Sequence, residues 1–266
     1  MVSPPRNDGS SAGRLPLKER YSSFVKRQSL VVWSTGAVEG FVPVTSKKTA
    51  SPARPRPRTV SPGRPPNSAV AARLRHILAV ASAEFVSRGY AEASVSRIAS
   101  NAGVSKKTIY ARYPNKDALL MAVAGDLATR SYEGVLTAMT ASEGDPAHVL
   151  TGFATQVATV WASPEAIGVY RLIVSEAGRF PQLASIYRDT MDRFRRTLAD
   201  YLRQQCDAGT LAIADVDAAS HQFGMLAYGE VREKGLLGET VTDDDIAAVV
   251  RRTVEVFLDG YSTRAH

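Results

Sequence analysis

The chain has 266 residues, a formal net charge of +7 and a single cysteine. This length is enough for two domains, or for one domain with a long tail. No stretch approaches the roughly eighteen consecutive apolar residues of a spanning helix, and the first residues lack the basic start and apolar core of a secretory signal. Because Cys206 stands alone, an internal disulfide and a thiolate metal site are excluded. We expect a cytoplasmic protein with no metal and no other cofactor.

The charge is distributed unevenly along the chain. Residues 1–68 carry twelve Lys or Arg against three acidic residues, residues 69–117 carry eight against three, and residues 118–266 carry thirteen against twenty. The net charges of the three segments are therefore +9, +5 and −7. A basic front and an acidic rear indicate a nucleic-acid binder with a separate regulatory body. Basic tails are also common in disordered termini, so the charge distribution alone does not decide whether the chain binds nucleic acid.

Residues 1–68 are rich in Pro, Ser, Arg and Gly, and we predict a disordered basic tail. Within it, Gly63-Arg64-Pro65 is similar to the core of an AT-hook, in which an extended arginine lies in the minor groove. Arg64 is therefore a candidate DNA contact. A solvated linker, or a start codon placed too far upstream, are the alternatives.

From residue 69 the apolar residues recur at helical spacing. Ile77, Ala81 and Phe85 place a stripe on one face of a helix over residues 69–88, and Gly89 is suited to end it. This helix is the first of a predicted three-helix head over residues 69–118.

Two short helices, over residues 95–102 and 106–112, are predicted next, joined by a tight turn. Gly103 lies where the turn needs a positive φ, which costs glycine little. Ser94 and Ser105 are the expected N-caps, and the Ser105 hydroxyl can accept from Lys107 or Thr108 N–H. This arrangement is typical of a helix-turn-helix, whose second helix enters the major groove. The residues expected to face inward are Ile98, Ala99, Ala102, Val104 and Ile109.

The remainder, residues 119–266, shows helical periodicity throughout, with no alternating strand pattern and no internal repeat. Asn115 is suited to cap a helix that runs from Lys116 to about residue 139, and Thr242 with three following aspartates marks a good helix start. Further helices are expected over residues 145–162, 165–178, 182–207, 215–235 and 242–260. The predicted fold is all-α: a head, a helical ligand-sensing and dimerisation body of about six helices, and the tail.

More than a dozen positions within about fifty residues form one dense motif: Ile77-Leu78, Phe85, Gly89-Tyr90, Ile98-Ala99, Ala102-Gly103-Val104-Ser105, Thr108-Ile109-Tyr110, Tyr113 and Lys116. This motif resembles the DNA-binding segment of TetR-type regulators. Tyr113 stands where that family usually has Phe, which leaves ring packing intact. The stretch Ile173-Val174-Ser175-Glu176-Ala177 looks like one C-terminal subclass of the family. The resemblance implies a repressor that binds a roughly palindromic operator as a homodimer and responds to a small molecule.

Candidate DNA contacts follow from helix-turn-helix geometry, in which the start of the second helix reads base edges and flanking groups hold phosphates. Lys106 and Lys107 can reach guanine or a phosphate, Thr108 can offer its methyl to thymine, and Lys116 is expected to clamp a phosphate. Tyr113 is more readily explained as core. The full candidate set is Ser94, Arg97, Ser105, Lys106, Lys107, Thr108, Tyr110, Tyr113, Lys116 and Arg64.

The last two helices are the expected dimer interface, although their apolar stripes would also serve to complete a monomer core. The candidate interface residues are Phe223, Leu226, Ala227, Val250, Val254 and Phe257. Aromatic and histidine side chains of the body are candidates to line an effector cavity, with ordinary core packing as the alternative. These are Phe153, Trp161, Tyr170, Phe180, Tyr187 and His221.

The sequence also bears on two other classes of function. The four histidines lack metal-ligand spacing, and no Gly-x-Ser-x-Gly elbow or Gly-rich phosphate loop is present, so we do not expect an enzyme. A sequence-tolerant architectural DNA-binding protein, driven by the basic tail, is the alternative to a regulator. The operator, the effector, the regulated genes and the sign of control are not encoded in any readable pattern.

Overall fold

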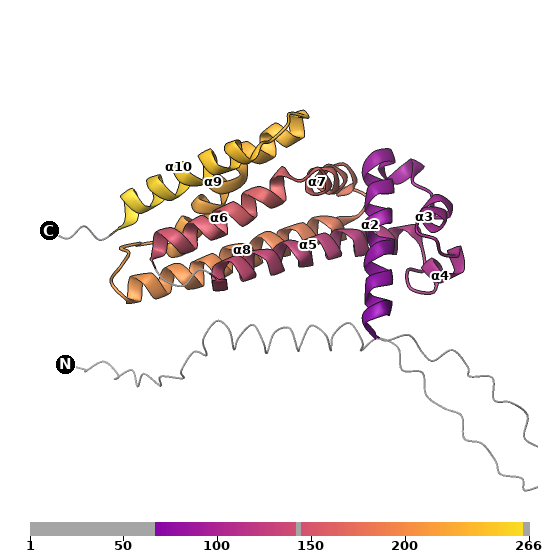
Figure 1. Ribbon diagram of the computed structural model, residues 1–266, viewed down its shortest axis with the longest axis horizontal. Coiled ribbons are helices and arrows are strands. Elements are labelled where there is room, and N and C mark those ends of the chain that lie inside the picture. The colour runs from indigo at the N-terminus through magenta and orange to yellow at the C-terminus, as the bar shows by residue number, and fades with distance from the viewer. Residues whose placement is uncertain (1–66, 142–144, 263–266) are drawn as a thin grey trace, which may run out of the picture. The chain divides into compact units, whose positions relative to one another are not determined.

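The computed structural model describes residues 67–141 and 145–262, and every regular element in these ranges is an α-helix (Figure 1). The predicted all-α fold is confirmed. The helices are α2 (Asn67–Glu92), α3 (Val95–Asn101), α4 (Lys106–Tyr110), α5 (Lys116–Ala141), α6 (Pro146–Ala162), α7 (Pro164–Glu176), α8 (Pro181–Asp207), α9 (Val216–Leu237) and α10 (Asp243–Tyr261).

Most helix ends lie within a few residues of their predicted positions because the capping residues act as expected. Asn115 Oδ1 accepts a hydrogen bond of 2.7 Å from Ala118 N–H at the start of α5. Thr242 and Asp245 form a reciprocal capping box at the start of α10. Gly89, with φ 73° and ψ 172°, breaks the regular helix within α2, so the chain from Gly89 to Glu92 forms a separate last turn.

The described chain contains two apolar cores. The head core is formed by α2 to α5 together with residues of α7 and the start of α8. The body core is formed by α5, α6, α8, α9 and α10. Helix α7 belongs to both, since Ile167 packs in the body core and Val169 packs in the head core. Any displacement of α7 therefore disturbs the packing of the head.

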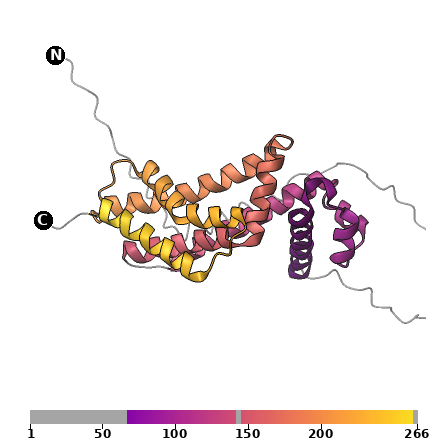
Figure 2. The same ribbon diagram turned by 90° about the horizontal axis from the view of Figure 1, so that it is seen from above.

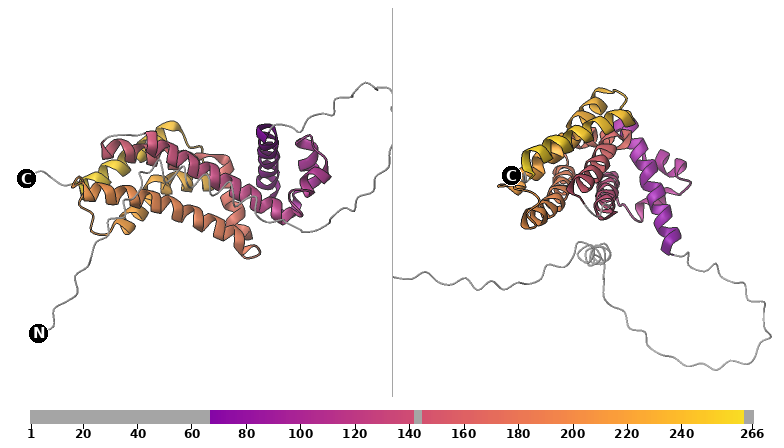
Figure 3. Two further views of the ribbon diagram at one scale, coloured as in Figure 1. Left: turned by 90° about the horizontal axis from the view of Figure 1, so that it is seen from below. Right: turned by 60° about the vertical axis from the view of Figure 1, so that its left-hand side comes forward.

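The long helices of the body run side by side, as the views in Figures 1 and 3 show. Helix α6 packs against α5, α9 and α10, and α8 packs against α5 and α9. Figure 2 shows α2, α3 and α4 together at one end of these helices. No helix in residues 67–141 or 145–262 combines the length and the hydropathy needed to cross a bilayer.

Two glycines permit close helix approach around α7. A Cβ at Gly168 would collide with both γ carbons of Val86 in α2. A Cβ at Gly235 in α9 would lie 2.8 Å from Ile167 Cγ1 in α7. Because real Cβ contacts are longer than this, glycine at these positions sets how closely α2 and α9 pack against α7.

Candidate nucleic-acid interface

Helices α3 and α4 are joined by a tight turn that the backbone holds in place. Val104 N–H donates to the Ala99 carbonyl at 2.9 Å, and Gly103 has the expected positive φ of 63°. The Ser105 hydroxyl accepts from Thr108 N–H at 3.1 Å, which confirms the predicted N-cap of α4. Ile109 is only 1% exposed, so α4 is seated on the head core by its inner face.

The opposite face of α4 points to solvent. Lys106 and Lys107 are exposed, and within the part of the chain that the structure describes neither has an acidic partner. Tyr110 is 46% exposed although it is a large aromatic residue. Thr108 is half-buried, with its Oγ1 2.9 Å from Ser105 Oγ. This face combines positive charge, hydroxyls and an exposed aromatic ring. Groups of these kinds contact phosphates and base edges in protein–DNA complexes.

Arg97 and Ser94, two of the predicted phosphate contacts, are engaged with Glu84 of α2. Arg97 Nε donates to Glu84 Oε1 at 2.8 Å, and Ser94 N–H donates to the same oxygen at 3.0 Å. The arginine also donates to the Glu92 carbonyl at 2.6 Å. Ser94 occupies the N-cap position of α3, but its side chain makes no capping hydrogen bond, so that expectation was wrong. The Glu84 carboxylate accepts the N–H of Ser94 itself and so anchors the start of α3 without capping its first turn.

Lys116 has internal partners as well. Its Nζ donates to the carbonyls of Tyr90, Ala91 and Ala93 at 2.8, 3.1 and 3.3 Å, and it lies 4.4 Å from the centre of the Tyr90 ring. Carbonyls at a helix end lack partners within the helix, and Lys116 supplies donors to them. The Tyr90 hydroxyl bonds to Asp117, and burial together with this bond raises the pKa of Tyr90 to about 12. The turn after α2 is thereby fastened to the start of α5.

The other predicted contacts of the head are placed as follows. Tyr113 is half-buried against the head core, and burial raises the pKa of its hydroxyl. Arg64 lies outside the described residues. Sequence reasoning missed Glu84, because one acidic residue within a helix carries no pattern that distinguishes it from a solvent-exposed one.

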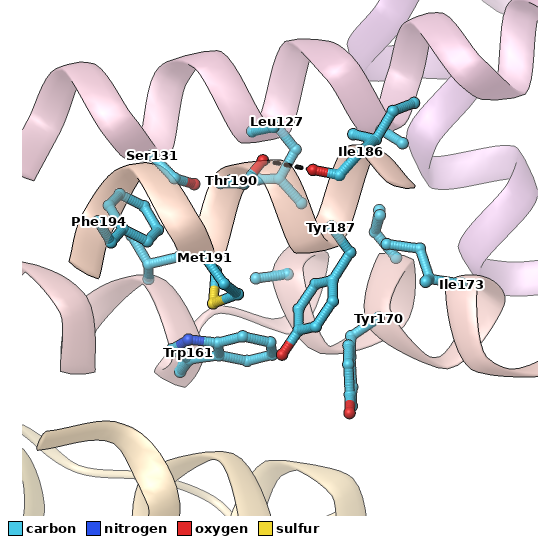
Figure 4. A pocket seen from close by; sticks show the side chains of 15 residues that line it. Leu127, Ser131, Trp161, Tyr170, Ile173, Ile186, Tyr187, Thr190, Met191 and Phe194 are labelled. Atoms are coloured by element: carbon cyan, nitrogen blue, oxygen red, sulfur yellow. Dashed lines mark hydrogen bonds between the residues drawn. The ribbon is translucent and has the colours of Figure 1, made fainter. Parts of the chain in front are cut away.

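The body contains a small apolar cavity between α5, α6, α7 and α8 (Figure 4). Its volume is about 60 Å³, and Trp161, Tyr170 and Tyr187 line it. Figure 4 shows the rings of Trp161, Tyr170 and Tyr187 gathered on one side of the cavity. The centroid of the Trp161 ring lies 5.2 Å from that of Tyr170 and 6.3 Å from that of Tyr187.

A larger cavity of about 410 Å³ lies between α6, α8 and α9, and Trp161 and Tyr187 line it too. Phe153 and His221 are also among its lining residues. Phe180 lines neither of these cavities: it packs in the head core, with its ring centroid 4.9 Å from that of Tyr90. Most of the other lining residues were missed, because helices far apart in the chain bring them together; Arg188, Tyr228 and Arg232 are among them.

The predicted dimer residues are mostly inside the protomer. Only Leu226 is exposed, at 49% of its surface. The other five belong to the body core and cannot meet a second copy directly: Phe223, Ala227, Val250, Val254 and Phe257. The apolar stripes of α9 and α10 therefore complete the core of the protomer.

A helix-turn-helix head with exposed lysines on α4, joined to a helical body that contains cavities, is the architecture of a DNA-binding regulator. Comparison with known families agrees. Residues 77–123 match the profile of bacterial regulatory proteins of the tetR family, and residues 148–263 match that of the C-terminal domain of AefR-like transcriptional repressors. The chain belongs to the TetR family of transcriptional regulators.

Solved structures share this fold. A protein from Mesorhizobium loti MAFF303099, described as a TetR-family regulator, superposes with a TM-score of 0.66 at 24% identity, over 73% of this chain and 98% of its own. The flavonoid-responsive regulator FrrA superposes with a TM-score of 0.58 at 26% identity, over 73% of this chain and 100% of its own. A transcriptional regulator from Saccharomonospora viridis, solved in complex with choline, superposes with a TM-score of 0.57 at 20% identity, over 73% of this chain and 100% of its own. No curated protein matches the chain.

Proposed function

We propose that this regulator is a ligand-responsive repressor that binds a two-fold symmetric operator as a homodimer in the cytoplasm. The observation that carries the proposal is the outer face of α4, where Lys106, Lys107 and Tyr110 are exposed and the lysines have no acidic partner among the described residues. Residues 69–118 would read DNA, and residues 119–266 would sense the effector and dimerise. No step of this function requires catalysis.

Exposed apolar side chains on the last two helices support a homodimer. Met225 and Leu226 in α9 are 40% and 49% exposed, and Val256 in α10 is 64% exposed. A single head reads too few bases for a useful specificity ratio, whereas two heads held at a fixed spacing read two half-sites. We propose that α9 and α10 pair with the same helices of a second copy through these side chains.

A polar link between head and body supports regulation by a ligand. Ser82 of α2 donates to Glu165 of α7 at 3.1 Å, and Arg130 of α5 donates to the same carboxylate at 2.9 Å. Helix α7 also lines the small cavity through Tyr170 and Ile173. A ligand that binds better to one position of α7 would therefore favour one position of the head. FrrA is described as flavonoid-responsive and the Saccharomonospora viridis protein was solved with choline bound, which supports the binding of a small molecule by this regulator.

Selection of bound DNA from a random library tests the proposal. The full chain and a chain that starts at Ala69 would be compared at the same salt concentration. We expect both to select one two-fold symmetric consensus. If no consensus emerges and binding is lost with residues 1–68, the basic tail drives a non-specific interaction, and the architectural alternative replaces the repressor.

A further inference from the structure

The lining of the larger cavity combines apolar and cationic side chains. Phe153, Trp161 and Met191 are apolar, while Arg188 of α8 and Arg232 of α9 are cationic. Its volume of about 410 Å³ falls within the range of roughly 300–1,000 Å³ that is usual for small-molecule sites. The cavity can therefore hold an amphipathic molecule with a charged end.

The charge of the lining is positive. It contains three arginines and one aspartate, a net of +2 with His221 neutral. Arg195 pairs with Asp192, but Arg188 contacts only the Ser185 hydroxyl, at 3.3 Å, and within residues 67–141 and 145–262 no carboxylate pairs with Arg188 or Arg232. Arg232 is half-buried and Arg188 is exposed, and the net positive charge of the lining favours an anion over a cation.

The tyrosines of the lining do not offset this charge. Burial raises the pKa of Tyr187 to about 12 and also raises the pKa of Tyr228, so both hydroxyls keep their protons at neutral pH. They contribute neutral hydrogen-bonding groups to the lining.

An aromatic cage next to the cavity already holds a cation. The Arg232 guanidinium lies 5.5, 5.6 and 5.0 Å from the ring centres of Trp161, Tyr170 and Tyr228. Such a cage would otherwise suit a quaternary ammonium ligand. Here a cationic ligand would have to displace Arg232 and enter a site that is already positive. A guanidinium stacked on rings still has its edge N–H groups, which match a carboxylate in a bidentate pair.

We propose that this cavity binds an aryl carboxylate, with the carboxylate on Arg232 and Arg188 and the flat ring system against Trp161 and Tyr228. The rings of these two residues are stacked on each other, with centroids 5.4 Å apart and an interplanar angle of 26°, so they form one aromatic cluster in the lining. That this anion acts as the effector rests on the proposed function. Its binding to the cavity is independent of the proposed function.

Isothermal titration calorimetry on the full chain tests the proposal with benzoate and 2-naphthoate, the neutral 2-naphthamide, and choline. We expect 2-naphthoate to bind, 2-naphthamide to bind at least about tenfold more weakly, and choline not to bind. Arg232→Gln and Arg188→Gln should each weaken 2-naphthoate binding by about 10- to 100-fold, the loss of one charge-assisted contact. Arg251→Gln, which removes an exposed charge of α10 outside the cavity, should change nothing.

Four results would overturn the proposal: no binding of either carboxylate at millimolar concentration, equal binding of acid and amide, tighter binding of choline, or unchanged binding in both arginine variants. Arg188 makes few contacts in the protomer, so Arg188→Gln remains informative if Arg232→Gln fails to fold. Operator affinity would be measured separately with and without 2-naphthoate. If the carboxylate binds and operator affinity does not change, the anion site stands and its role as an effector site is wrong.

Discussion

Glu84 Oε1 in α2 lies 2.8 Å from Arg97 Nε in α3, and the Glu84 side chain is only 7% exposed. The same oxygen accepts Ser94 N–H, so one carboxylate fixes the start of α3 against α2. The hydrogen bond from Arg97 holds the pKa of Glu84 below its ordinary value, although burial opposes this shift. The first helix of the helix-turn-helix is thus positioned by an ionised side chain.

Glu84→Gln should lower the free energy of unfolding at neutral pH by about 1–2 kcal/mol, because Arg97, which is partly exposed, loses a charged acceptor. The native pKa of Glu84 lies below its unfolded value of about 4.3, so the stabilisation is complete above that pH and is lost as the pH falls through the native pKa. Urea unfolding at neutral and acidic pH measures this difference. The exposed Glu92→Gln is the matched control, and a difference that persists in acid would contradict the argument.

Lys116→Met should destabilise the head by about 1–2 kcal/mol, because three carbonyls lose their donor. With its Nζ committed to these acceptors, we expect the dependence of operator affinity on salt concentration to be unchanged. Thermal melts and operator titrations at several salt concentrations separate the two roles. A slope reduced by about one, with unchanged stability, would instead identify Lys116 as a phosphate contact.

Lys107→Ala and Thr108→Ala should change base preference, because both residues lie on the first turn of α4. We expect a shift of about 1–3 kcal/mol between bases at one position of each half-site. Selection from a library randomised at the operator measures this preference for each variant. Arg88→Ala, an exposed charge near the end of α2, serves as the control. An unchanged consensus with uniformly weaker binding would limit Lys107 to a phosphate contact.

The sequence predicted the helices and the turn of the head because these depend on local signals. Gly103 needs only its own φ, and Ser105 needs only an N–H three residues away. The side-chain partners could not be predicted in this way. Lys116 donates to carbonyls more than twenty residues earlier in the chain. In the sequence, a lysine that contacts a phosphate cannot be distinguished from a lysine that donates to carbonyls of its own chain.

In the body, too, the sequence predicted the helices but not the partners of their side chains. Periodicity identified apolar stripes on α9 and α10, but it could not say whether a stripe faces the same chain or a second copy. Five of the six chosen residues face the same chain. The arginines of the larger cavity come from α8 and α9, and only the packing of these helices shows that Arg188 and Arg232 share a site.

Leu226→Glu should convert a dimer to monomers, because Leu226 is exposed in the protomer and a carboxylate at a symmetric interface would face its own copy. The fold should be retained, and operator affinity should fall together with dimerisation. Sedimentation velocity and operator titration measure the two effects. Val174→Glu places the same charge on another exposed apolar position, in α7, and should leave the dimer intact. An unaffected dimer in Leu226→Glu would show that the interface lies elsewhere.

Gly168→Ala tests the contact between head and body. The added methyl would collide with Val86, so α2 and α7 must separate, at a cost of about 1–3 kcal/mol for overpacking. We expect a lower melting temperature and a changed operator affinity. Gly125→Ala in α5 adds the same methyl in open space and should stabilise the helix by roughly 0.5–1 kcal/mol.

In Gly168→Ala with Val86→Ala, the space is restored, and a double-mutant cycle should give a favourable coupling energy of about 1–2 kcal/mol. Additive effects would mean that Gly168 and Val86 do not transmit strain between α7 and the DNA-binding head.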